Sequence, residues 1–427
     1  MSAYLPRLID SQLAELLDIL PAIALNGPKG VGKTASARRQ ARTVVDLDDP
    51  FVRETVAAEP QRFLGAKPPV LLDEWQRMPE VWDRVRRQVD DGAEPGRFLL
   101  TGSAYPQGAA IHSGAGRIVP VRMRPLALAE RGIATATVSL DRLLEGDATL
   151  TGDSAVLLSD YVEEITASGF PGIRPQPARA RGLLLDAYID NVIQREFPDQ
   201  GLTVRAPDTL RRWLRAYAAA VGTTASYSRI LDSATPGEAD KPAKTTTIAY
   251  RDVLSNLWLL DPVPAWAPDG DAFGRLAQTP KHYLADPALS ARLLDLDLEE
   301  LLGGGADRND VVRGMSMAYG SILGRLFEAL VALSLHAYCA RDDARLAHLR
   351  TRNGDREVDF VVQRKNAVVA VEVKLSASVS DDDVRHLRWL KARLGDRLAD
   401  AIVVTTGPTA YRRADGIGIV PAALLGA

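Results

Sequence analysis

Two short stretches of this sequence carry residues whose types and spacing suit phosphate chemistry. The first fits the pattern G-x-x-x-x-G-K-[ST] and consists of Gly27, Pro28, Lys29, Gly30, Val31, Gly32, Lys33 and Thr34. Glycines let the backbone wrap closely around a phosphate, and the N-terminus of a following helix adds its positive dipole end. We expect Lys33 to reach the β- and γ-phosphates and the Thr34 hydroxyl to bind Mg²⁺. The loop therefore predicts a binding site for Mg-ATP.

The second stretch is an apolar run, 69–72, that ends in Asp73 and Glu74. Because ligands of open α/β sheets bind at the carboxyl ends of the strands, both carboxylates should lie beside the bound phosphates. We expect Asp73 to hold Mg²⁺, through water, and Glu74 to orient and activate the attacking water. Two acids after an apolar run are also typical of a solvated strand end. Their position about 40 residues after the glycine-rich loop favours the catalytic interpretation.

Three further side chains could act near the γ-phosphate. Thr101 and Ser103 follow the next apolar run, and a hydroxyl at this strand end could contact the γ-phosphate, with Ser103 preferred. The alternative role of Ser103 is a helix cap. Arg117 could act as an arginine finger, in cis or from a neighbouring subunit, and the alternative is an ordinary surface arginine.

A charged hairpin is predicted near the C-terminus. Segments 356–362 and 369–374 alternate charged and apolar residues around the polar tip 363–366. If the tip closes symmetrically, Asp359 lies opposite Ala370 and Glu357 opposite Glu372, which gives one apolar face and one charged face. Asp359 and Glu372 would then be close enough to hold one Mg²⁺ or Mn²⁺, with Lys374 beside them. The alternative is an amphipathic hairpin with a solvated charged face.

Regular elements around these residues indicate an α/β fold. Five short apolar runs alternate with helical stretches, which predicts a parallel sheet covered on both faces; the runs are 22–25, 43–47, 70–72, 97–101 and 118–121. Helices broken at Gly169-Phe170-Pro171-Gly172 fill residues 140–200, and three short helices are expected at 209–221, 226–234 and 245–259. A longer helix, from about Val312 to Tyr338, precedes the C-terminal strands.

Size and composition restrict the class of protein. The 427 residues correspond to roughly three domains at about 150 residues each. The net charge of −3 provides no global electrostatic case for nucleic-acid binding, so a local basic patch would have to make it. The single cysteine, Cys339, excludes an internal disulfide and is expected to be buried. We find no run of 18 apolar residues and no signal peptide, so we expect a cytoplasmic protein that does not span a membrane.

The order of these motifs resembles the bacterial and archaeal AAA-type ATPases that carry a winged-helix and a restriction-endonuclease-like C-terminal half. The matching residues cover nearly the whole chain: Arg7 and segments 27–34, 45–48, 71–74, 99–103, 116–117, 125–126, 169–171, 188–195, 282–286, 356–360 and 371–374. One departure is the polar insert 236–244, where such proteins turn tightly between two helices.

This resemblance implies a multidomain α/β organisation. The implied parts are an AAA-type P-loop domain at 1–135, a helical lid or connector at 136–205, a winged-helix-like domain at 206–300 and a nuclease-like domain of the PD-(D/E)xK type at 306–427. Glu328 would be the first acidic residue of that nuclease-like core, and together with Asp359, Glu372 and Lys374 it would form a second metal site.

Three functions are consistent with these motifs. The leading interpretation is an ATPase whose nucleotide state controls a DNA-binding and potentially nucleolytic C-terminal region. The main alternative is an ATP-dependent, non-nucleolytic switch that binds a protein partner, and the third is an ATP-binding protein with almost no hydrolysis. Assembly into a homo-oligomer is compatible with each of them.

Overall fold

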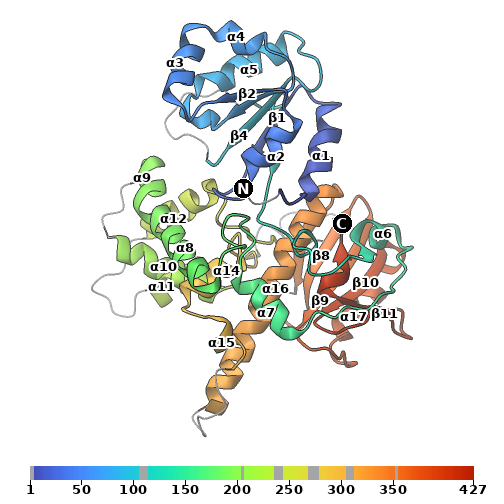
Figure 1. The fold of residues 1–427 in the computed structure, drawn as a ribbon. Coiled ribbons are helices and arrows are strands. Elements are labelled where there is room, and N and C mark those ends of the chain that lie inside the picture. Colours follow the sequence, from blue (N-terminus) through green and yellow to red (C-terminus); the bar gives the residue numbers. More distant parts are fainter. Residues whose placement is uncertain are drawn as a thin grey trace.

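The chain forms three packed parts in the computed structural model, which describes residues 4–104, 114–202, 206–234, 244–267, 278–303, 312–351 and 354–427. The N-terminal P-loop domain lies at the top of Figure 1, the middle helices lie below it on the left, and the C-terminal sheet lies on the right. Residues 236–243 of the polar insert lie outside the described residues.

The P-loop domain is built on a five-stranded sheet in the order β2-β3-β4-β1-β5, and every strand pair is parallel. Its strands are β1 (Ala22–Asn26), β2 (Thr43–Asp46), β3 (Val70–Asp73), β4 (Phe98–Gly102) and β5 (Val119–Arg122). Its helices are α1 (Leu8–Leu17), α2 (Lys33–Gln40), α3 (Pro50–Ala58), α4 (Pro60–Leu64), a 3-10 turn (Trp75–Arg77) and α5 (Glu80–Asp90). The predicted parallel sheet is confirmed, with strand boundaries within one residue of the apolar runs.

Alternate side chains of these strands enter two different cores. Ile23, Leu25, Leu71 and Leu99 pack with α1 and with the middle helices, whereas Ala24 and Leu72 pack with the helices of the opposite face. Because both faces are covered, the strands are apolar throughout, which is typical of parallel sheets.

The segment after β5 leaves the P-loop domain and joins the C-terminal part. A 3-10 turn (Leu128–Glu130) leads to β6 (Val138–Ser139) and α6 (Leu140–Glu145). Strand β6 pairs with β13 (Leu425–Gly426), and α6 packs on the C-terminal sheet. The structure thus places residues 138–145 with the C-terminal domain, although the sequence grouped them with the helical connector.

The middle part is helical, as predicted. Its helices are α7 (Leu158–Thr166), α8 (Ala178–Asn191), a π-helical turn (Val192–Glu196), α9 (Phe197–Asp199), α10 (Pro207–Ala219), α11 (Tyr227–Ala234), α12 (Lys244–Asn256), α14 (Pro287–Leu293) and α15 (Leu298–Leu301). The three helices expected between 209 and 259 correspond to α10, α11 and α12. After α12, antiparallel bridges Leu260↔Leu284 and Val263↔Lys281 form a two-stranded ribbon.

The C-terminal part is a mixed six-stranded sheet in the order β11-β12-β10-β9-β8-β7. Its elements are α16 (Val312–Arg341), β7 (Arg345–Arg350), β8 (Glu357–Arg364), β9 (Ala367–Lys374), α17 (Arg385–Leu394), a 3-10 turn (Gly395–Arg397), β10 (Leu398–Thr405), β11 (Tyr411–Arg412), β12 (Gly418–Pro421), a 3-10 turn (Ala422–Leu424) and β13. Strands β7, β8 and β9 form an antiparallel meander, and β10 adds in parallel to β9.

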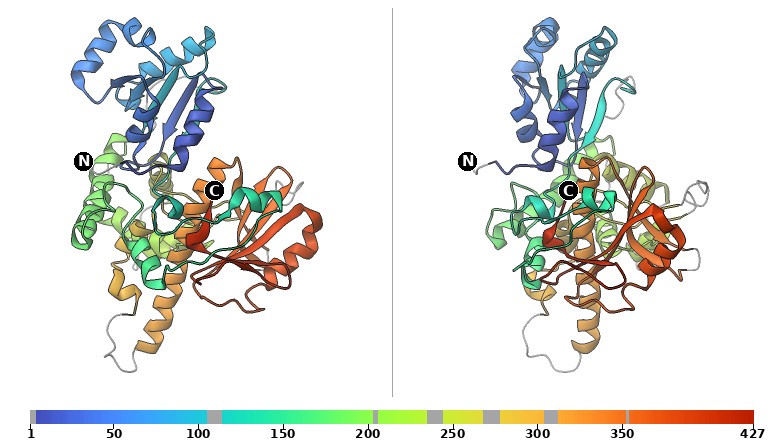
Figure 2. Two further views of the ribbon diagram at one scale, coloured as in Figure 1. Left: turned by 45° about the vertical axis from the view of Figure 1, so that its right-hand side comes forward. Right: turned by 90° about the vertical axis from the view of Figure 1, so that its right-hand side faces the viewer.

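Helix α16 contacts both the middle helices and the C-terminal sheet (Figures 1 and 2). Its segment Ile322–Arg341 is long and apolar enough to cross a membrane by length and composition alone, but 67% of its most apolar stretch is buried inside the protein. A core helix meets the same criteria, and the packing of α16 against β7 and β9 is that of a core helix. Cys339 of α16 is buried, as predicted.

Candidate nucleotide site and C-terminal carboxylate cluster

The glycine-rich loop connects β1 to α2 at the carboxyl edge of the sheet. Gly30 and Gly32 have φ angles of 81° and 99°, in the left-handed region that favours glycine. Gly27 has no room for a side chain, because a Cβ atom there would lie 2.2 Å from the carbonyl oxygen of Met123. The backbone conformation therefore needs glycine at these positions, and α2 begins directly afterwards at Lys33.

The Lys33 side chain folds back over this loop. It is buried, and its Nζ donates hydrogen bonds to the carbonyl oxygens of Gly27 (2.8 Å) and Pro28 (2.9 Å). Burial lowers the pKa of Lys33 to about 8, while the carboxylates of Glu74 and Asp73 act in the opposite direction. The two carbonyl groups are neutral and compensate the positive charge of the Lys33 ammonium only in part. A bound polyphosphate would supply the missing negative charge.

Thr34 and Asp73 lie together, as the sequence predicted. The Thr34 hydroxyl donates to Asp73 Oδ1 at 2.8 Å, and the Thr101 hydroxyl donates to the same oxygen. Asp73 is the last residue of β3 and is buried. Hydroxyl and carboxylate oxygens suit Mg²⁺, so Thr34 and Asp73 could hold the ion of Mg-ATP. Thr101 thus holds the Asp73 carboxylate in place.

Glu74 follows β3 in a left-handed backbone conformation, with φ 54° and ψ 44°. A non-glycine residue in this region is strained and needs support from its surroundings. The Gln76 amide donates to Glu74 Oε2 and holds the side chain in place. Burial raises the pKa of Glu74 above its ordinary value, although the Lys33 ammonium opposes this shift.

A cavity of about 690 Å³ opens beside the loop on the side of β4. Lys29, Gly30 and Ser103 line it from the P-loop domain, and Arg195 lines it from the π-helical turn. The Lys29 ammonium is paired with Glu196 of the same turn. Ser103 thus lies near the loop, as predicted. Arg195 is a further cation at this cavity, beside Lys29 and Arg77. It belongs to the segment 188–195 that carried part of the resemblance, but no role was predicted for it.

Arg117 lies at the amino ends of the strands, whereas the phosphate loop lies at their carboxyl ends. Strand β5 is parallel to β1, with Ile23 paired to Val119 and Asn26 to Arg122, so the residues before β5 are at the edge far from the loop. The Arg117 guanidinium donates to Asp90 Oδ1 at 2.6 Å. This position disfavours a role in cis, because β5 separates Arg117 from the phosphate loop. An ordinary surface arginine paired with Asp90 and a contribution to a neighbouring subunit are both compatible with it, and the second stays a prediction.

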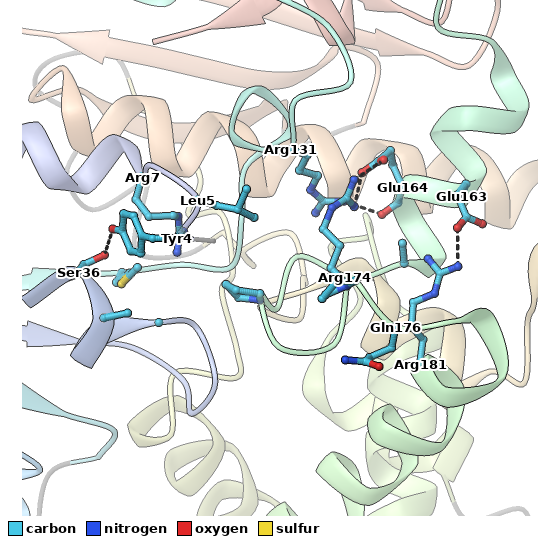
Figure 3. Close-up of a pocket in the computed structure, with 16 residues that line it drawn as sticks. Tyr4, Leu5, Arg7, Ser36, Arg131, Glu163, Glu164, Arg174, Gln176 and Arg181 are labelled. Carbon is cyan, nitrogen blue, oxygen red and sulfur yellow. Dashed lines mark hydrogen bonds and ion pairs between the residues drawn. The ribbon is translucent and has the colours of Figure 1, made fainter. Parts of the chain in front are cut away.

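A second cavity, of about 720 Å³, lies on the other side of the loop. Gly32, Ala35 and Ser36 line it from the P-loop domain, whereas the opposite wall comes from the N-terminal segment and from residues 163–181. Figure 3 shows Tyr4 and Ser36 at one end and Arg174, Gln176 and Arg181 at the other. The Tyr4 hydroxyl and Ser36 Oγ are 2.7 Å apart.

Buried ion pairs fix the walls of this cavity. Glu164 accepts hydrogen bonds from Arg174 at 2.6 Å, twice, and from Arg131 at 3.1 Å (Figure 3). Arg7 donates to the carbonyl oxygen of Val31 at 2.8 Å and to Glu130 at 3.0 Å. Arg7 thereby attaches the N-terminal segment to the phosphate loop, whereas the ion pairs of Glu164 join α7 to Arg131 and Arg174 in the cavity wall. Apart from Arg7, which carried part of the resemblance, the sequence offered no signal for these residues.

The C-terminal carboxylates surround an unexpected lysine. Lys281, from the ribbon that follows α12, has its Nζ 2.8 Å from Asp359 Oδ1, 3.0 Å from Glu328 Oε1 and 3.4 Å from Glu357 Oε1. Its side chain is only 1% exposed. The structure therefore brings Glu328 and Asp359 together, as predicted, but around an ammonium group.

Glu372 belongs to a neighbouring pair. Its Oε1 is 3.1 Å from Lys374 Nζ. Burial raises the pKa of Glu372 to about 8, and the nearby Asp359 carboxylate adds to this effect. Burial would also raise the pKa of Asp359, but Lys281 lowers it below the ordinary value.

The hairpin register differs from the symmetric one expected. Phe360 pairs with Val371 and Arg364 with Ala367, which shifts β9 by two residues relative to the prediction. A shift of two keeps each side chain on its predicted face. The prediction of a charged second face is nevertheless wrong, because Val361 and Ala370 are buried on it in the core beneath α17. The charged residues gather at the open end of the hairpin instead.

This arrangement does not fit the predicted second Mg²⁺ or Mn²⁺. In the described part of the chain, no group of three or more His, Cys, Asp or Glu side chains is placed to hold a metal ion. The carboxylate oxygens of Glu328 and Asp359 are separated by the Lys281 ammonium, at distances normal for charge-assisted hydrogen bonds. The prediction is corrected for this physical reason: a lysine from another part of the chain takes the cation position.

Comparisons with known proteins divide the chain in a similar way. Residues 20–131 match a family model described as "AAA domain". Residues 158–300 and 323–425 match two models described as domains of unknown function (DUF8612 and DUF4143). The N-terminal part is thus an AAA-type P-loop domain. Neither of the other descriptions mentions a winged helix or a nuclease, and both assignments stay predictions.

Two relatives with similarity over most of the chain are named uncharacterized proteins. An uncharacterized protein of Mycobacterium bovis and one of Mycobacterium tuberculosis are each 26% identical over 423 residues, which is 96% of this chain and 82% of theirs.

Two solved structures are also similar. A Walker-type ATPase of Pyrococcus abyssi is 16% identical, covers 66% of this chain and 94% of its own, and has a TM-score of 0.39. The ORC2 protein of Aeropyrum pernix is 14% identical, covers 72% of this chain and 91% of its own, and has a TM-score of 0.27. The family match and the geometry of the loop support an ATPase of the AAA type.

Proposed function

We propose that this chain hydrolyses Mg-ATP and that its nucleotide state changes the contact between the P-loop domain and the middle helices. The observation that carries the proposal is the convergence of Lys33, Thr34, Asp73 and Glu74 at the carboxyl edge of one parallel sheet. Each of these side chains has a separate task in phosphoryl transfer to water.

Each residue of the site would have one role in binding or hydrolysing ATP. The loop amides and Lys33 bind the β- and γ-phosphates, while Thr34 and Asp73 hold the Mg²⁺ that neutralises phosphate charge. Glu74 would accept a proton from the water whose oxygen attacks the γ-phosphorus, while the bond from this phosphorus to the β–γ bridging oxygen breaks, so that ADP and inorganic phosphate are the products. Ser103, which follows β4, would contact the γ-phosphate, and Arg195 of the π-helical turn would stabilise negative charge; both line the cavity beside the loop.

The nucleoside would occupy the 720 Å³ cavity on the other side of the loop. Gly32, Ala35 and Ser36 connect this cavity directly to the phosphate site, and its volume is within the range of small-molecule pockets. Tyr4 offers an aromatic ring and a hydroxyl there.

Two contacts support a coupling between nucleotide and middle helices. Lys29 of the loop is paired with Glu196, and the Tyr188 hydroxyl donates to the carbonyl oxygen of Lys29 at 3.2 Å. A bound polyphosphate would compete with Glu196 for the Lys29 ammonium, so binding would favour a different position of the π-helical turn.

The target of this switch has two candidates. Helices α10 to α12 followed by the ribbon are compatible with the winged helix predicted from the resemblance, and this favours DNA. However, two arginines of α10 that could contribute to a basic patch, Arg211 and Arg215, pair with Asp190 and Asp295. Since the net charge is also −3, we propose a protein partner as the first candidate and duplex DNA as the second.

One experiment tests both ATP hydrolysis and the nature of the target. ATP turnover should be measured for the wild-type chain and for Lys33→Ala, with and without nicked, branched and intact duplex DNA. Turnover that is lost in Lys33→Ala supports the ATPase. Stimulation by DNA would favour the second candidate, whereas a folded wild-type protein without turnover would refute the proposal.

A further inference from the structure

Lys281 connects two parts of the molecule through a pocket of carboxylates. The ribbon strand that carries it pairs with Val263 through two backbone hydrogen bonds, of 2.9 and 3.0 Å. The first strand of the ribbon in turn docks on the edge strand β7: Trp266 N donates to the carbonyl oxygen of His348 (2.6 Å), and His348 N donates to that of Pro264 (2.9 Å). The ribbon is thus an extension of the C-terminal sheet, and Lys281 enters the pocket from it.

The pocket surrounds the buried Lys281 ammonium with negative charge and an aromatic ring. Three carboxylates, from Glu328, Asp359 and Glu357, lie within 3.4 Å of its nitrogen. The ring of Phe360 lies 5.7 Å from the same nitrogen, within the distance of a cation–π contact. Burial would lower the pKa of Lys281, but Asp359, Glu328 and Glu357 raise it above the ordinary value, so the lysine stays charged at any physiological pH.

Hydrogen bonds from other groups hold the carboxylates in this arrangement. The Tyr283 hydroxyl donates to Glu328 Oε1, and Val373 N donates to Asp359 Oδ2 at 2.9 Å. Tyr283 is two residues from Lys281 on the same ribbon strand, so the ribbon supplies both the cation and a hydroxyl donor. A metal ion would need oxygen ligands at about 2.0–2.6 Å, closer together than a pocket built around an ammonium group allows.

We infer that Lys281 is a built-in cation that permanently occupies the position of a divalent metal in this domain. The cluster then joins the ribbon to the C-terminal sheet without metal, and the domain has no metal-dependent nuclease activity. The inference does not depend on ATP hydrolysis, since none of its groups lies in the nucleotide site.

The test compares wild type, Lys281→Met and the control Lys365→Met, which changes an exposed lysine at the hairpin tip. All three should carry Asp73→Asn and be studied without nucleotide, so that the ATP site contributes no bound metal. Thermal unfolding is followed with Mn²⁺, with EDTA, and with NaCl of equal ionic strength. Bound Mn²⁺ is measured by electron paramagnetic resonance.

The expected result is a wild-type melting temperature that is the same with Mn²⁺ and EDTA, with no bound Mn²⁺. Lys281→Met should melt several degrees lower than Lys365→Met, because it leaves buried carboxylates without a partner. Mn²⁺, but not NaCl, should restore part of that loss.

Two results would overturn the inference. One is a folded Lys281→Met protein whose melting temperature does not respond to Mn²⁺. The other is Mn²⁺ bound by the wild type and lost in Asp359→Asn. This second measurement uses the unaltered lysine, so it decides the question even if Lys281→Met fails to fold.

Discussion

Replacing Glu74 by glutamine tests the proposed general base with almost no change in side-chain shape. Glutamine can keep the contact with Gln76 and the position after β3, so Mg-ATP binding through Lys33 and Thr34 should survive. The proton acceptor, however, is lost. A positioned general base contributes roughly 10²–10⁴-fold in rate, so the activation barrier should rise by about 3–5 kcal/mol.

The pH dependence of this variant provides a second signature. Burial raises the pKa of Glu74 above its ordinary value, and the base acts only when deprotonated, so kcat of the wild type should rise as pH increases through this pKa. The rise should be absent in Glu74→Gln. Because the Glu74 carboxylate also raises the pKa of Lys33, which burial lowers to about 8, the variant should lose ATP affinity at a lower alkaline pH than the wild type.

The assay is phosphate release at saturating Mg-ATP, with nucleotide binding measured in parallel. Glu80→Gln, an exposed carboxylate at the start of α5, is the matched control and should behave like the wild type. Lys33→Ala sets the background from contaminating ATPases. Turnover of Glu74→Gln at the wild-type rate, above that background, would refute the role of Glu74.

Further predictions concern the walls of the site. Gly27→Ala should abolish nucleotide binding, because its Cβ would lie 2.2 Å from the Met123 carbonyl oxygen; calorimetry checks this. Ala35→Trp should fill the 720 Å³ cavity and weaken ATP binding more than inorganic triphosphate binding, whereas equal weakening would place the nucleoside elsewhere. Glu164→Gln should lower the free energy of unfolding by about 3–5 kcal/mol, since it removes the charge that Arg131 and Arg174 share. Burial raises the pKa of Glu164, but Arg174 and Arg131 bring it below the ordinary value, so this stabilisation is present above the unfolded-state pKa and is lost as pH falls through the folded-state one; denaturant unfolding at several pH values checks the sign. Arg117→Ala should leave the turnover of a monomer unchanged, and a large loss in dilute monomeric protein would contradict its position beyond β5.

The nucleotide site could be predicted because its signals are local in the sequence. The loop 27–34 requires glycine conformations and a following helix, and Asp73 and Glu74 end a strand whose apolar residues are all buried. The position of Arg117 could not be judged in the same way. It depends on which edge of the sheet the start of β5 occupies, and strand direction is a property of the whole sheet.

The C-terminal cluster shows a second limit of sequence patterns. Alternation in 356–362 and 369–374 correctly indicated a hairpin, but it did not show that α17 covers the second face or that the register shifts by two residues. Lys281 is 78 residues before Asp359, with no periodicity linking the two. Only the docking of the ribbon on β7 brings this lysine to the carboxylates, and a buried lysine carries no signature of its own in a sequence.

Calorimetric titration of the wild-type chain and of Lys33→Ala with Mg-ATP is the most direct test of the central claim, that loop 27–34 binds the polyphosphate of ATP. We predict saturable binding of one nucleotide per wild-type chain, weaker binding without Mg²⁺, and no binding heat for folded Lys33→Ala. A folded wild-type protein that shows no saturable heat, or a Lys33→Ala protein that binds as tightly as the wild type, would contradict the claim.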